Sequence, residues 1–224
     1  MDRDRDATRD THRDGDIAAQ TVGGFLDALA SDAPAPGGGA AAALSAAMGA
    51  ALVSMVCNLT VGRERYQAHE EVMRAALGEA EELRTRALAL ATADGDAFGA
   101  VGAAYALPRK TDEEKAARTA RVQEVLKGAA GPPLRTVAVA ARVVELCVEI
   151  APWGNPNVVS DVGVAALSAR AALDGAALNV RVNLALIRDE DFARETAQEL
   201  GRHLSEAHPL VDEALRLVDG VMAR

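Results

Sequence analysis

The sequence predicts an all-α protein: a bundle of long helices around a buried, Ala/Gly-rich central helix, assembled as a dimer. Residues 33–62 carry no charged side chain, although 25% of the whole chain is charged. Apolar residues elsewhere recur at helical spacing, and no segment shows the alternating pattern of a strand. Aromatic residues are only 3% of the 224 residues, so the core should be thin. Such a core favours helix packing and further burial between subunits.

The N-terminal segment differs from the rest of the chain. Residues 1–16 alternate Asp and Arg and contain no large apolar side chain after Met1. A segment of this composition cannot bury enough apolar surface to fold. We therefore predict a disordered, charged arm at residues 1–20 and one helical domain at residues 21–224. The arm lacks the apolar core of a secretory signal, and we expect a cytoplasmic protein.

The uncharged segment begins with a Pro/Gly loop, APAPGGG, and continues as an alanine-rich helix to about residue 61. Its length would suffice to span a membrane. However, polar residues punctuate it and the chain has few aromatics for an interfacial belt. We favour a central helix buried on all sides, in which Ala42, Ala46 and Ala50 allow close packing. Ser54 and Asn58 share a face, so in a buried helix they need hydrogen-bond partners or a ligand.

The other helices follow from periodicity and from start and stop signals. Thr21 can cap a short helix, and Pro108 ends a long amphipathic stretch that a break near Asp94 and Gly95 could interrupt. The sequence TDEE, starting at Thr111, fits a capping box, and two prolines suit the first turn of the helix that follows. We expect helices at residues 21–30, 38–61, 65–106, 111–130, 132–150, 159–186 and from 189 onward, the last with a kink near Pro209.

The helix after the loop PWGNPN carries small or polar residues on or near one stripe. These residues are Asp161, Ser168, Ala172, Gly175, Asn179 and Asn183. The stripe fits either a close helix crossing with a few hydrogen-bonded amides or the polar wall of a cleft.

Charge and cysteine content exclude several classes of function. The formal charge of −9 argues against a nucleic-acid-binding protein, which needs clustered Lys and Arg. Cys57 and Cys147 lie in apolar helical runs and are typical of buried thiols rather than of a disulfide framework. Neither cysteine has metal-ligand spacing and the four histidines are scattered, so we expect no metal site.

Several ordered segments resemble the cyclodeaminase/cyclohydrolase family. The resemblance covers roughly residues 22–204. In the segment MGAALVSMVCNLTVG it is closest to the stand-alone methenyltetrahydrofolate cyclohydrolases, and the absence of a formiminotransferase domain points the same way. The segments that carry it are FLDALAS before APAPGGG, then GAALVSMVCNLTVGRERY, DGDAF, LPRKTDEEKAAR, GNPNVVSDVGVAALSA and ALNVRVNL. The resemblance implies an all-α bundle that acts as a dimer, with a tetrahydrofolate derivative as its substrate and the folate cleft near the subunit contact. Together with the composition arguments above, we expect no metal, nucleic-acid or membrane partner.

Both family activities need a proton shuttle beside one tetrahedral carbon, and carboxylates can supply it. The catalytic candidates are Asp94, which matches the family motif, Asp96 and Asp161. The alternative role for each is a helix cap or a solvated face. The glycines of the loop allow a ligand to approach the backbone at a helix N-terminus, although a tight turn would also explain them. The substrate-binding candidates are Pro36, Gly37, Gly38, Gly39, Asn58, Arg63, Arg65, Tyr66, Arg109, Asn155, Asn157, Ser160, Asn179 and Asn183.

The chain departs from the family at its basic positions. The stand-alone enzymes commonly carry Lys-Lys-Lys-Tyr where this chain has Arg63-Glu64-Arg65-Tyr66, and they carry Lys where it has Arg109. Arginine binds a folate carboxylate well but cannot act as a proton-transfer lysine. Three functions remain open: hydrolysis of 5,10-methenyltetrahydrofolate to 10-formyltetrahydrofolate, cyclodeamination of formiminotetrahydrofolate with release of ammonia, and non-catalytic folate binding by a helical dimer.

Overall fold

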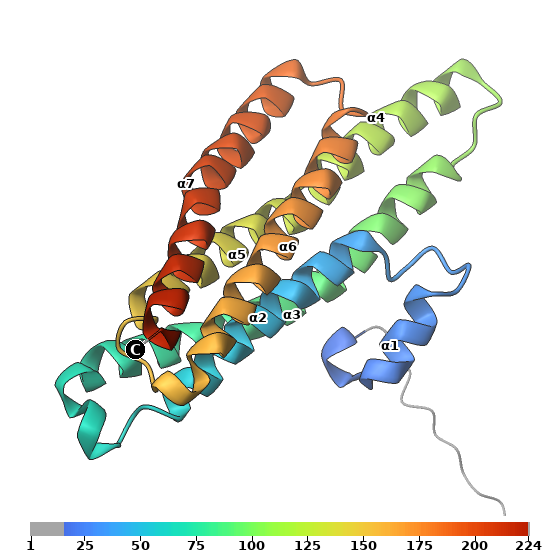
Figure 1. The fold of residues 1–224 in the computed structure, drawn as a ribbon. Coiled ribbons are helices and arrows are strands. Elements are labelled where there is room, and N and C mark those ends of the chain that lie inside the picture. Colours follow the sequence, from blue (N-terminus) through green and yellow to red (C-terminus); the bar gives the residue numbers. More distant parts are fainter. Residues whose placement is uncertain (1–15, 224) are drawn as a thin grey trace, which may run out of the picture.

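The computed structural model describes residues 16–223, and within this range every regular element is a helix (Figure 1). The long helices run side by side and form a bundle, which confirms the all-α prediction. In chain order the elements are η1 (Ile17–Ala19), α1 (Val22–Leu29), α2 (Gly38–Asn58), η2 (Glu64–His69), α3 (Glu70–Tyr105), α4 (Asp112–Ala129), α5 (Gly131–Ile150), η3 (Pro156–Val158), α6 (Val159–Leu184) and α7 (Glu190–Met222).

Helix α2 is the uncharged helix of the sequence and packs most extensively against α3 and α6. Its small residues permit this close approach. A Cβ atom added at Gly49 would lie 3.0 Å from the carbonyl oxygen of Ala165 in α6, and one added at Gly175 of α6 would lie 3.3 Å from Ala42. By length and composition α2 alone among the described helices is apolar enough to cross a membrane, but in this fold it lies within the bundle.

The outer face of α2 differs from the expectation of a helix buried on all sides. Met48 is 56% exposed and Met55 is 37% exposed, while Ala50 and Val53 are fully buried. The helix therefore has an inner face and an apolar outer face, which composition alone could not separate. Asn58 is exposed in the last turn and Ser54 is buried, so the two do not form the buried polar pair that the sequence suggested.

Helix α3 is continuous where the sequence allowed a break, since Asp94 and Gly95 lie in its interior. A glycine in a helix costs only about 1 kcal/mol relative to alanine, and packing against α2 outweighs that cost. The capping box of α4 is present, with the Thr111 hydroxyl accepting a hydrogen bond from the backbone N–H of Glu114. Pro209 lies inside α7.

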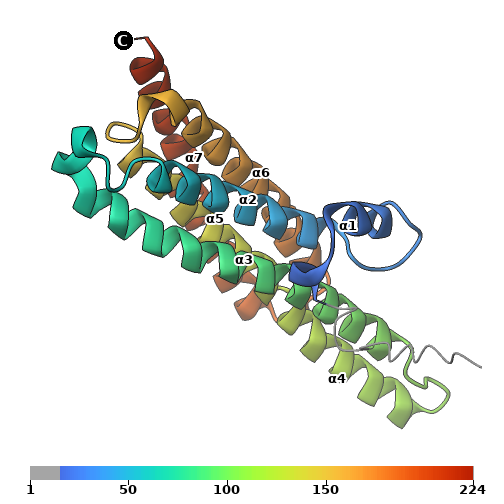
Figure 2. The same ribbon diagram turned by 90° about the horizontal axis from the view of Figure 1, so that it is seen from below.

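The segment before α2 lies on the side of the bundle, with η1 against α3 (Figure 2). Ordered structure begins earlier than the expected boundary at residue 20, because Ile17 is buried and its N–H donates to the Thr92 hydroxyl of α3 at 3.2 Å. Thr21 caps α1 as predicted, accepting from the backbone N–H of Gly24. The rest of the predicted arm, residues 1–15, lies outside the described residues.

Candidate functional site

The N-terminal end of α2 holds the first group of candidate residues. Gly37 is the N-cap, and no side chain of its own caps this helix. The Asp94 carboxylate of α3 lies there instead, so close to Gly39 that a Cβ atom at position 39 would overlap it. A side chain at position 39 would therefore displace the Asp94 carboxylate, whereas an added Cβ atom at Gly37 would meet nothing within 4 Å.

The surroundings of Asp94 change its proton affinity. Burial raises the pKa of this carboxyl above its ordinary value, while the backbone N–H of Ala40 at the start of α2 acts in the opposite direction. Burial dominates because it disfavours the charged form. The raised pKa increases the proton affinity of this carboxyl, which suits it to accept and return a proton.

Asn179 and Asn183 of α6 face this end of the bundle but are largely engaged by backbone. The Asn179 amide donates to the carbonyl of Gly175 at 2.9 Å, and a Cβ atom at Gly38 would lie 3.6 Å from its nitrogen. The Asn183 amide donates to the carbonyls of Asn179 at 2.9 Å and Ala129 at 3.2 Å. Asn183 thus joins α6 to the end of α4, which favours the helix-crossing interpretation for that residue, whereas Asn179 lies beside the glycine loop.

Asp96 is exposed and lines a separate cavity of about 230 Å³ with Pro36, Thr92 and Gly95. Two residues after Asp94 on a helix, it points away from the Asp94 side. Asp96 is therefore more exposed than the half-buried Asp94, and the two carboxylates do not form a pair.

The second group of candidates lies beyond the opposite end of α2. Arg63, Arg65, Tyr66, Asn155 and Asn157 line a cavity of about 300 Å³. The Tyr66 hydroxyl donates to Asn155 Oδ1 at 2.9 Å and accepts a hydrogen bond from Arg65, whose guanidinium carbon lies 4.4 Å from the Tyr66 ring centroid. These contacts hold one arginine against the cavity wall.

The loop after α5 is fixed to this basic cavity. The backbone N–H of Asn155 donates to the buried Thr60 hydroxyl at 3.0 Å, and the Asn155 amide donates to the carbonyl of Leu59. His69 and Trp153 stack nearby, with ring centroids 3.9 Å apart. Sequence reasoning missed this stacked pair, because 84 positions separate the residues and neither lies in a recognisable local motif.

The remaining candidates are distributed between the two ends or lie outside both. Ser160 is exposed and Asp161 half-buried in the first turn of α6, which follows the Asn155 loop. Arg109 is exposed in the connection between α3 and α4, and the structure does not bring it to either group. The two groups are separated by the 21 residues of α2, or about 30 Å at 1.5 Å per residue. The two groups therefore lie at opposite ends of α2.

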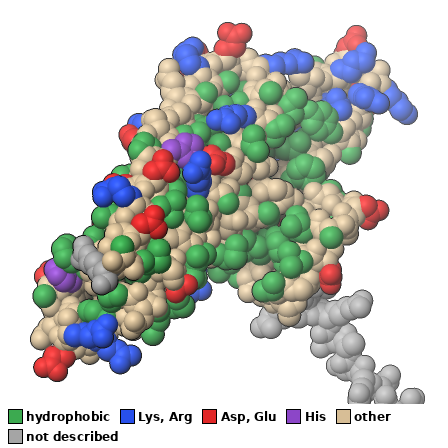
Figure 3. Space-filling view, in the orientation of Figure 1, with side chains coloured by type: hydrophobic (Ala, Val, Ile, Leu, Met, Phe, Trp, Pro, Cys, Tyr) green, Lys and Arg blue, Asp and Glu red, His purple; other side chains and the backbone are tan. Residues whose placement is uncertain are grey.

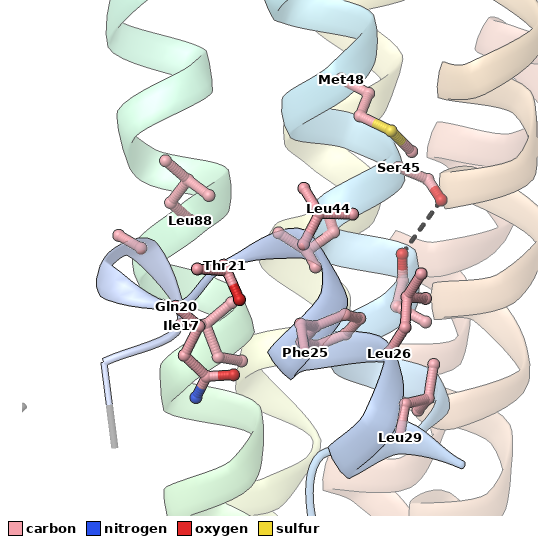
Figure 4. Close-up of a pocket in the computed structure, with 13 residues that line it drawn as sticks. Ile17, Gln20, Thr21, Phe25, Leu26, Leu29, Leu44, Ser45, Met48 and Leu88 are labelled. Atoms are coloured by element: carbon pink, nitrogen blue, oxygen red, sulfur yellow. Dashed lines mark hydrogen bonds between the residues drawn. The ribbon is translucent and has the colours of Figure 1, made fainter. Parts of the chain in front are cut away.

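An apolar cavity of about 430 Å³ separates α1 from the bundle (Figure 4). Phe25, Leu26 and Leu29 of α1 point into it from one side, and Leu44 and Met48 of α2 face them (Figure 4). Its wall offers little hydrogen bonding, since the Ser45 hydroxyl donates to the carbonyl of Ala41 at 3.0 Å. The cavity suits apolar side chains better than a charged substrate.

Neither cysteine is part of these sites. Cys57 and Cys147 are free and buried, as predicted, and burial raises the pKa of the Cys57 thiol to about 12. Within residues 16–223, no three side chains of His, Cys, Asp or Glu are grouped so that they could hold a metal ion.

Comparison with known proteins relates these sites to a family. The formiminotransferase-cyclodeaminase family matches residues 21–202. A methenyltetrahydrofolate cyclohydrolase of Methylorubrum extorquens is 51% identical over 191 residues, which cover 85% of this chain and 92% of that protein. The rat formimidoyltransferase-cyclodeaminase is 34% identical over 82% of this chain, but the chain spans only about a third (34%) of its length.

A solved structure agrees with the bundle. The crystal structure of a formiminotetrahydrofolate cyclodeaminase from Thermotoga maritima matches with a TM-score of 0.82 and 29% sequence identity. The match covers 92% of this chain and 98% of that one. The resemblance seen in the sequence segments thus extends to the whole arrangement of helices.

Proposed function

The chain belongs to the formiminotransferase-cyclodeaminase family, and we infer that it is a methenyltetrahydrofolate cyclohydrolase of one-carbon metabolism. The observation that carries this inference is the 51% identity to a cyclohydrolase over nearly the full length of both proteins. The enzyme hydrolyses 5,10-methenyltetrahydrofolate to 10-formyltetrahydrofolate. We propose that the half-buried carboxyl of Asp94 supplies the acid–base group that this reaction needs.

The reaction begins with water attack on the carbon that bridges N5 and N10 of the cationic substrate. Asp94, as a carboxylate, accepts the proton of the attacking water. The resulting tetrahedral carbon bears a hydroxyl group. When its bond to N5 breaks, N5 takes the proton held by Asp94, and the hydroxyl group loses its proton to water as the formyl carbonyl forms. The formyl group remains on N10. The half-buried Asp94 carboxylate also stabilises the positive charge of the bound substrate.

We propose that the other candidate residues hold the substrate at a distance from the reacting carbon. Gly37, Gly38 and Gly39 let the folate approach the first amides of α2 without a steric clash. Arg63 and Arg65 would bind the anionic glutamate tail, because guanidinium groups pair with carboxylates in well-defined geometry.

A second candidate function is supported by one observation. The structural match with the Thermotoga maritima protein, which is described as a formiminotetrahydrofolate cyclodeaminase, extends over 98% of that chain. Cyclodeamination uses the same geometry: N10 attacks the formimino carbon on N5, and ammonia leaves after proton transfer. Measuring ammonia released from formiminotetrahydrofolate separates this activity from hydrolysis.

We further propose that the protein is a cytoplasmic homodimer. The support for the dimer is the apolar outer face of α2 and α6, where Met48 and Leu178 are 56% and 64% exposed (Figure 3). Burying such a face between two copies would stabilise the dimer by roughly 25 cal/mol for each Å² of apolar surface removed from water.

The proposed activity is tested by following the absorbance of 5,10-methenyltetrahydrofolate with the purified protein. We expect it to disappear faster than in buffer, with 10-formyltetrahydrofolate as product. A rate equal to that of buffer, with protein whose helical circular dichroism is intact, would rule out the cyclohydrolase assignment.

A further inference from the structure

Phe98 differs from every other Phe, Tyr and Trp side chain in residues 16–223. Phe25 is buried, and each remaining ring lies beneath a cationic side chain or stacks on another ring. These pairs are Tyr66 with Arg65, Tyr105 with Arg118, Phe192 with Lys127 and Trp153 with His69. Within the same range the Phe98 ring has no such partner, and it is 54% exposed. Its face is therefore free to stack on a flat ligand.

The position of Phe98 on α3 explains its exposure. Ala87 and Ala91 belong to the face of α3 that packs in the core, and both are fully buried. Asp94 comes next on this face and reaches the first turn of α2 at Gly39. Phe98 follows four residues later, so it lies on the same face as Asp94, one turn further along. Because α3 and α4 continue past the N-terminal end of α2 (Figure 1 and Figure 2), α2 does not cover this turn.

Helix α6 contributes a hydrogen-bond acceptor to the same end of α2. Asn179 lies beside Gly38, which directly precedes the glycine that Asp94 approaches. Its amide nitrogen donates to the carbonyl of Gly175 at 2.9 Å, which fixes the orientation of the amide group. The Asn179 Oδ1 atom accepts no hydrogen bond from any residue that the structure describes, and the side chain is half-buried. An oxygen in this position needs a donor from water or from a ligand.

Two rings flank the reacting carbon of methenyltetrahydrofolate, and their polar edges differ. The reduced pterin ring carries N–H donors at N3, at N8 and on its 2-amino group. The p-aminobenzoyl ring has no N–H donor on its own edge. Stacking on an aromatic side chain suits either ring, but a free acceptor oxygen suits only the pterin. The pair formed by Phe98 and Asn179 therefore matches the pterin end of the substrate.

We propose, on the basis of the function inferred above, that Phe98 and Asn179 hold the pterin ring of the substrate beside Asp94. The Phe98 ring stacks on the face of the pterin, and the Asn179 oxygen accepts a hydrogen bond from one of its N–H groups. The bridging carbon is bonded to N5 of the pterin, so this placement brings that carbon to the Asp94 carboxyl. Phe98 thus contributes binding and orientation of the substrate, and Asp94 contributes the proton transfer.

The stacking contact is tested by titrating the full chain with 5-formyltetrahydrofolate, which carries the pterin ring but lacks the bridge between N5 and N10. We expect Phe98→Leu to raise Kd about tenfold, because leucine keeps an apolar side chain but offers no aromatic face. Phe98→Tyr keeps the ring and should bind nearly as tightly as the wild type. Tyr105→Leu is the matched control on α3 and should leave Kd unchanged, since Arg118 already covers that ring. Equal Kd values for the wild type and Phe98→Leu would overturn the proposal, as would failure of the folded wild type to bind this folate.

Fragments of the substrate identify the ring that these residues hold. We expect Phe98→Leu to weaken binding of 6-methyltetrahydropterin and to leave binding of p-aminobenzoylglutamate unchanged, both measured by ligand-detected nuclear magnetic resonance. The opposite result would place the p-aminobenzoyl ring on Phe98 and overturn the assignment. Asn179→Leu should also weaken binding of the pterin fragment, whereas Asn179→Asp keeps an acceptor oxygen and should retain it. Equal losses in both Asn179 variants would contradict the acceptor role.

These binding measurements separate failure of the pterin contact from failure of the inferred function. If the wild type does not hydrolyse methenyltetrahydrofolate but its affinity for the pterin depends on Phe98, the function is wrong and the contact stands. If the wild type is active, Phe98→Leu should raise KM for methenyltetrahydrofolate more than it lowers kcat, because the lost stacking is present before and during the reaction. An active wild type together with wild-type Kd and KM in Phe98→Leu would leave the function intact and refute the contact.

Discussion

Replacing Asp94 by Asn separates a catalytic from a structural role for this residue. Asparagine keeps the shape of the side chain and can still accept a hydrogen bond from the Ala40 amide, but it cannot take a proton from water at neutral pH. General acid–base groups typically contribute about 10²–10⁴-fold to the rate. We therefore expect kcat to fall by that factor, or about 3–5 kcal/mol in the activation free energy, with little change in KM.

The stability of this variant should move in the opposite direction from that of an ordinary cap mutation. Burial raises the pKa of Asp94 in the folded protein, so the folded state binds this proton more tightly than the unfolded state does. Ionisation of Asp94 therefore lowers stability as the pH rises. The Asn variant avoids that cost, and we expect its Tm at pH 7 to equal or exceed that of the wild type. Loss of a capping carboxylate would instead destabilise by about 1 kcal/mol.

Steady-state kinetics with methenyltetrahydrofolate and thermal melting, both at pH 7, measure the two effects in the same preparation. Glu at position 94 provides a control that keeps the acid but moves it by one methylene. A folded Asn variant with nearly wild-type kcat would refute the reasoning and shift attention to Asp96 or Asp161. A large fall in Tm would indicate that Asp94 acts mainly by capping α2.

Four further predictions follow from individual contacts. Gly39→Ala should displace the Asp94 carboxylate and lower kcat strongly. Gly78→Ala is the control and should leave kcat unchanged, because an added Cβ atom there meets nothing within 4 Å. Equal kcat values for the two variants would contradict the proximity of Gly39 to Asp94. In the wild type, the acidic limb of the rate profile should lie at higher pH than an ordinary Asp would give, because activity needs the carboxylate and burial raises its pKa; a flat profile down to pH 4 would contradict this. Single Arg63→Met and Arg65→Met variants should raise KM more than they lower kcat for at least one position, and two unchanged KM values would reject the tail-binding role. Finally, Arg142 donates to Glu79 at 2.6 and 2.7 Å and holds the pKa of that carboxyl below its usual range. Arg142→Met should therefore lower the free energy of unfolding by about 1 kcal/mol at pH 7, and by progressively less as the pH falls and Glu79 takes up its proton. A melting-temperature difference independent of pH would exclude this contribution.

Helix positions were predictable because they depend on local signals. Thr21 and Thr111 start their helices as hydroxyl caps should, and Pro132 and Pro133 lie in the first turn of α5. The sequence could not separate the inner and outer faces of α2, because an alanine-rich helix without charges has no polar stripe to mark its exposed side. It suggested a break at Gly95 because glycine is a poor helix former, and only the packing of α3 against α2 shows why the helix continues.

The candidate site was predictable as a set of residues but not as an arrangement. Asp94 could be chosen because few titratable residues match the motif, but its contact with Gly39 joins positions 55 residues apart and depends on the register of α3 against α2. Asn183 looked like a ligand from its place on a stripe, whereas its amide is occupied by two backbone carbonyls. The separation of Arg63 from Asp94 is likewise a property of helix length, which became visible only when both ends of α2 were placed.

The most direct measurement of the central claim is product analysis with two substrates on one preparation of the full chain. The protein is incubated separately with 5,10-methenyltetrahydrofolate and 5-formiminotetrahydrofolate, and folates and ammonia are quantified over time. The cyclohydrolase assignment predicts enzyme-dependent formation of 10-formyltetrahydrofolate from the methenyl substrate, abolished in Asp94→Asn. Ammonia release from the formimino substrate without any acceleration of methenyl hydrolysis would contradict it.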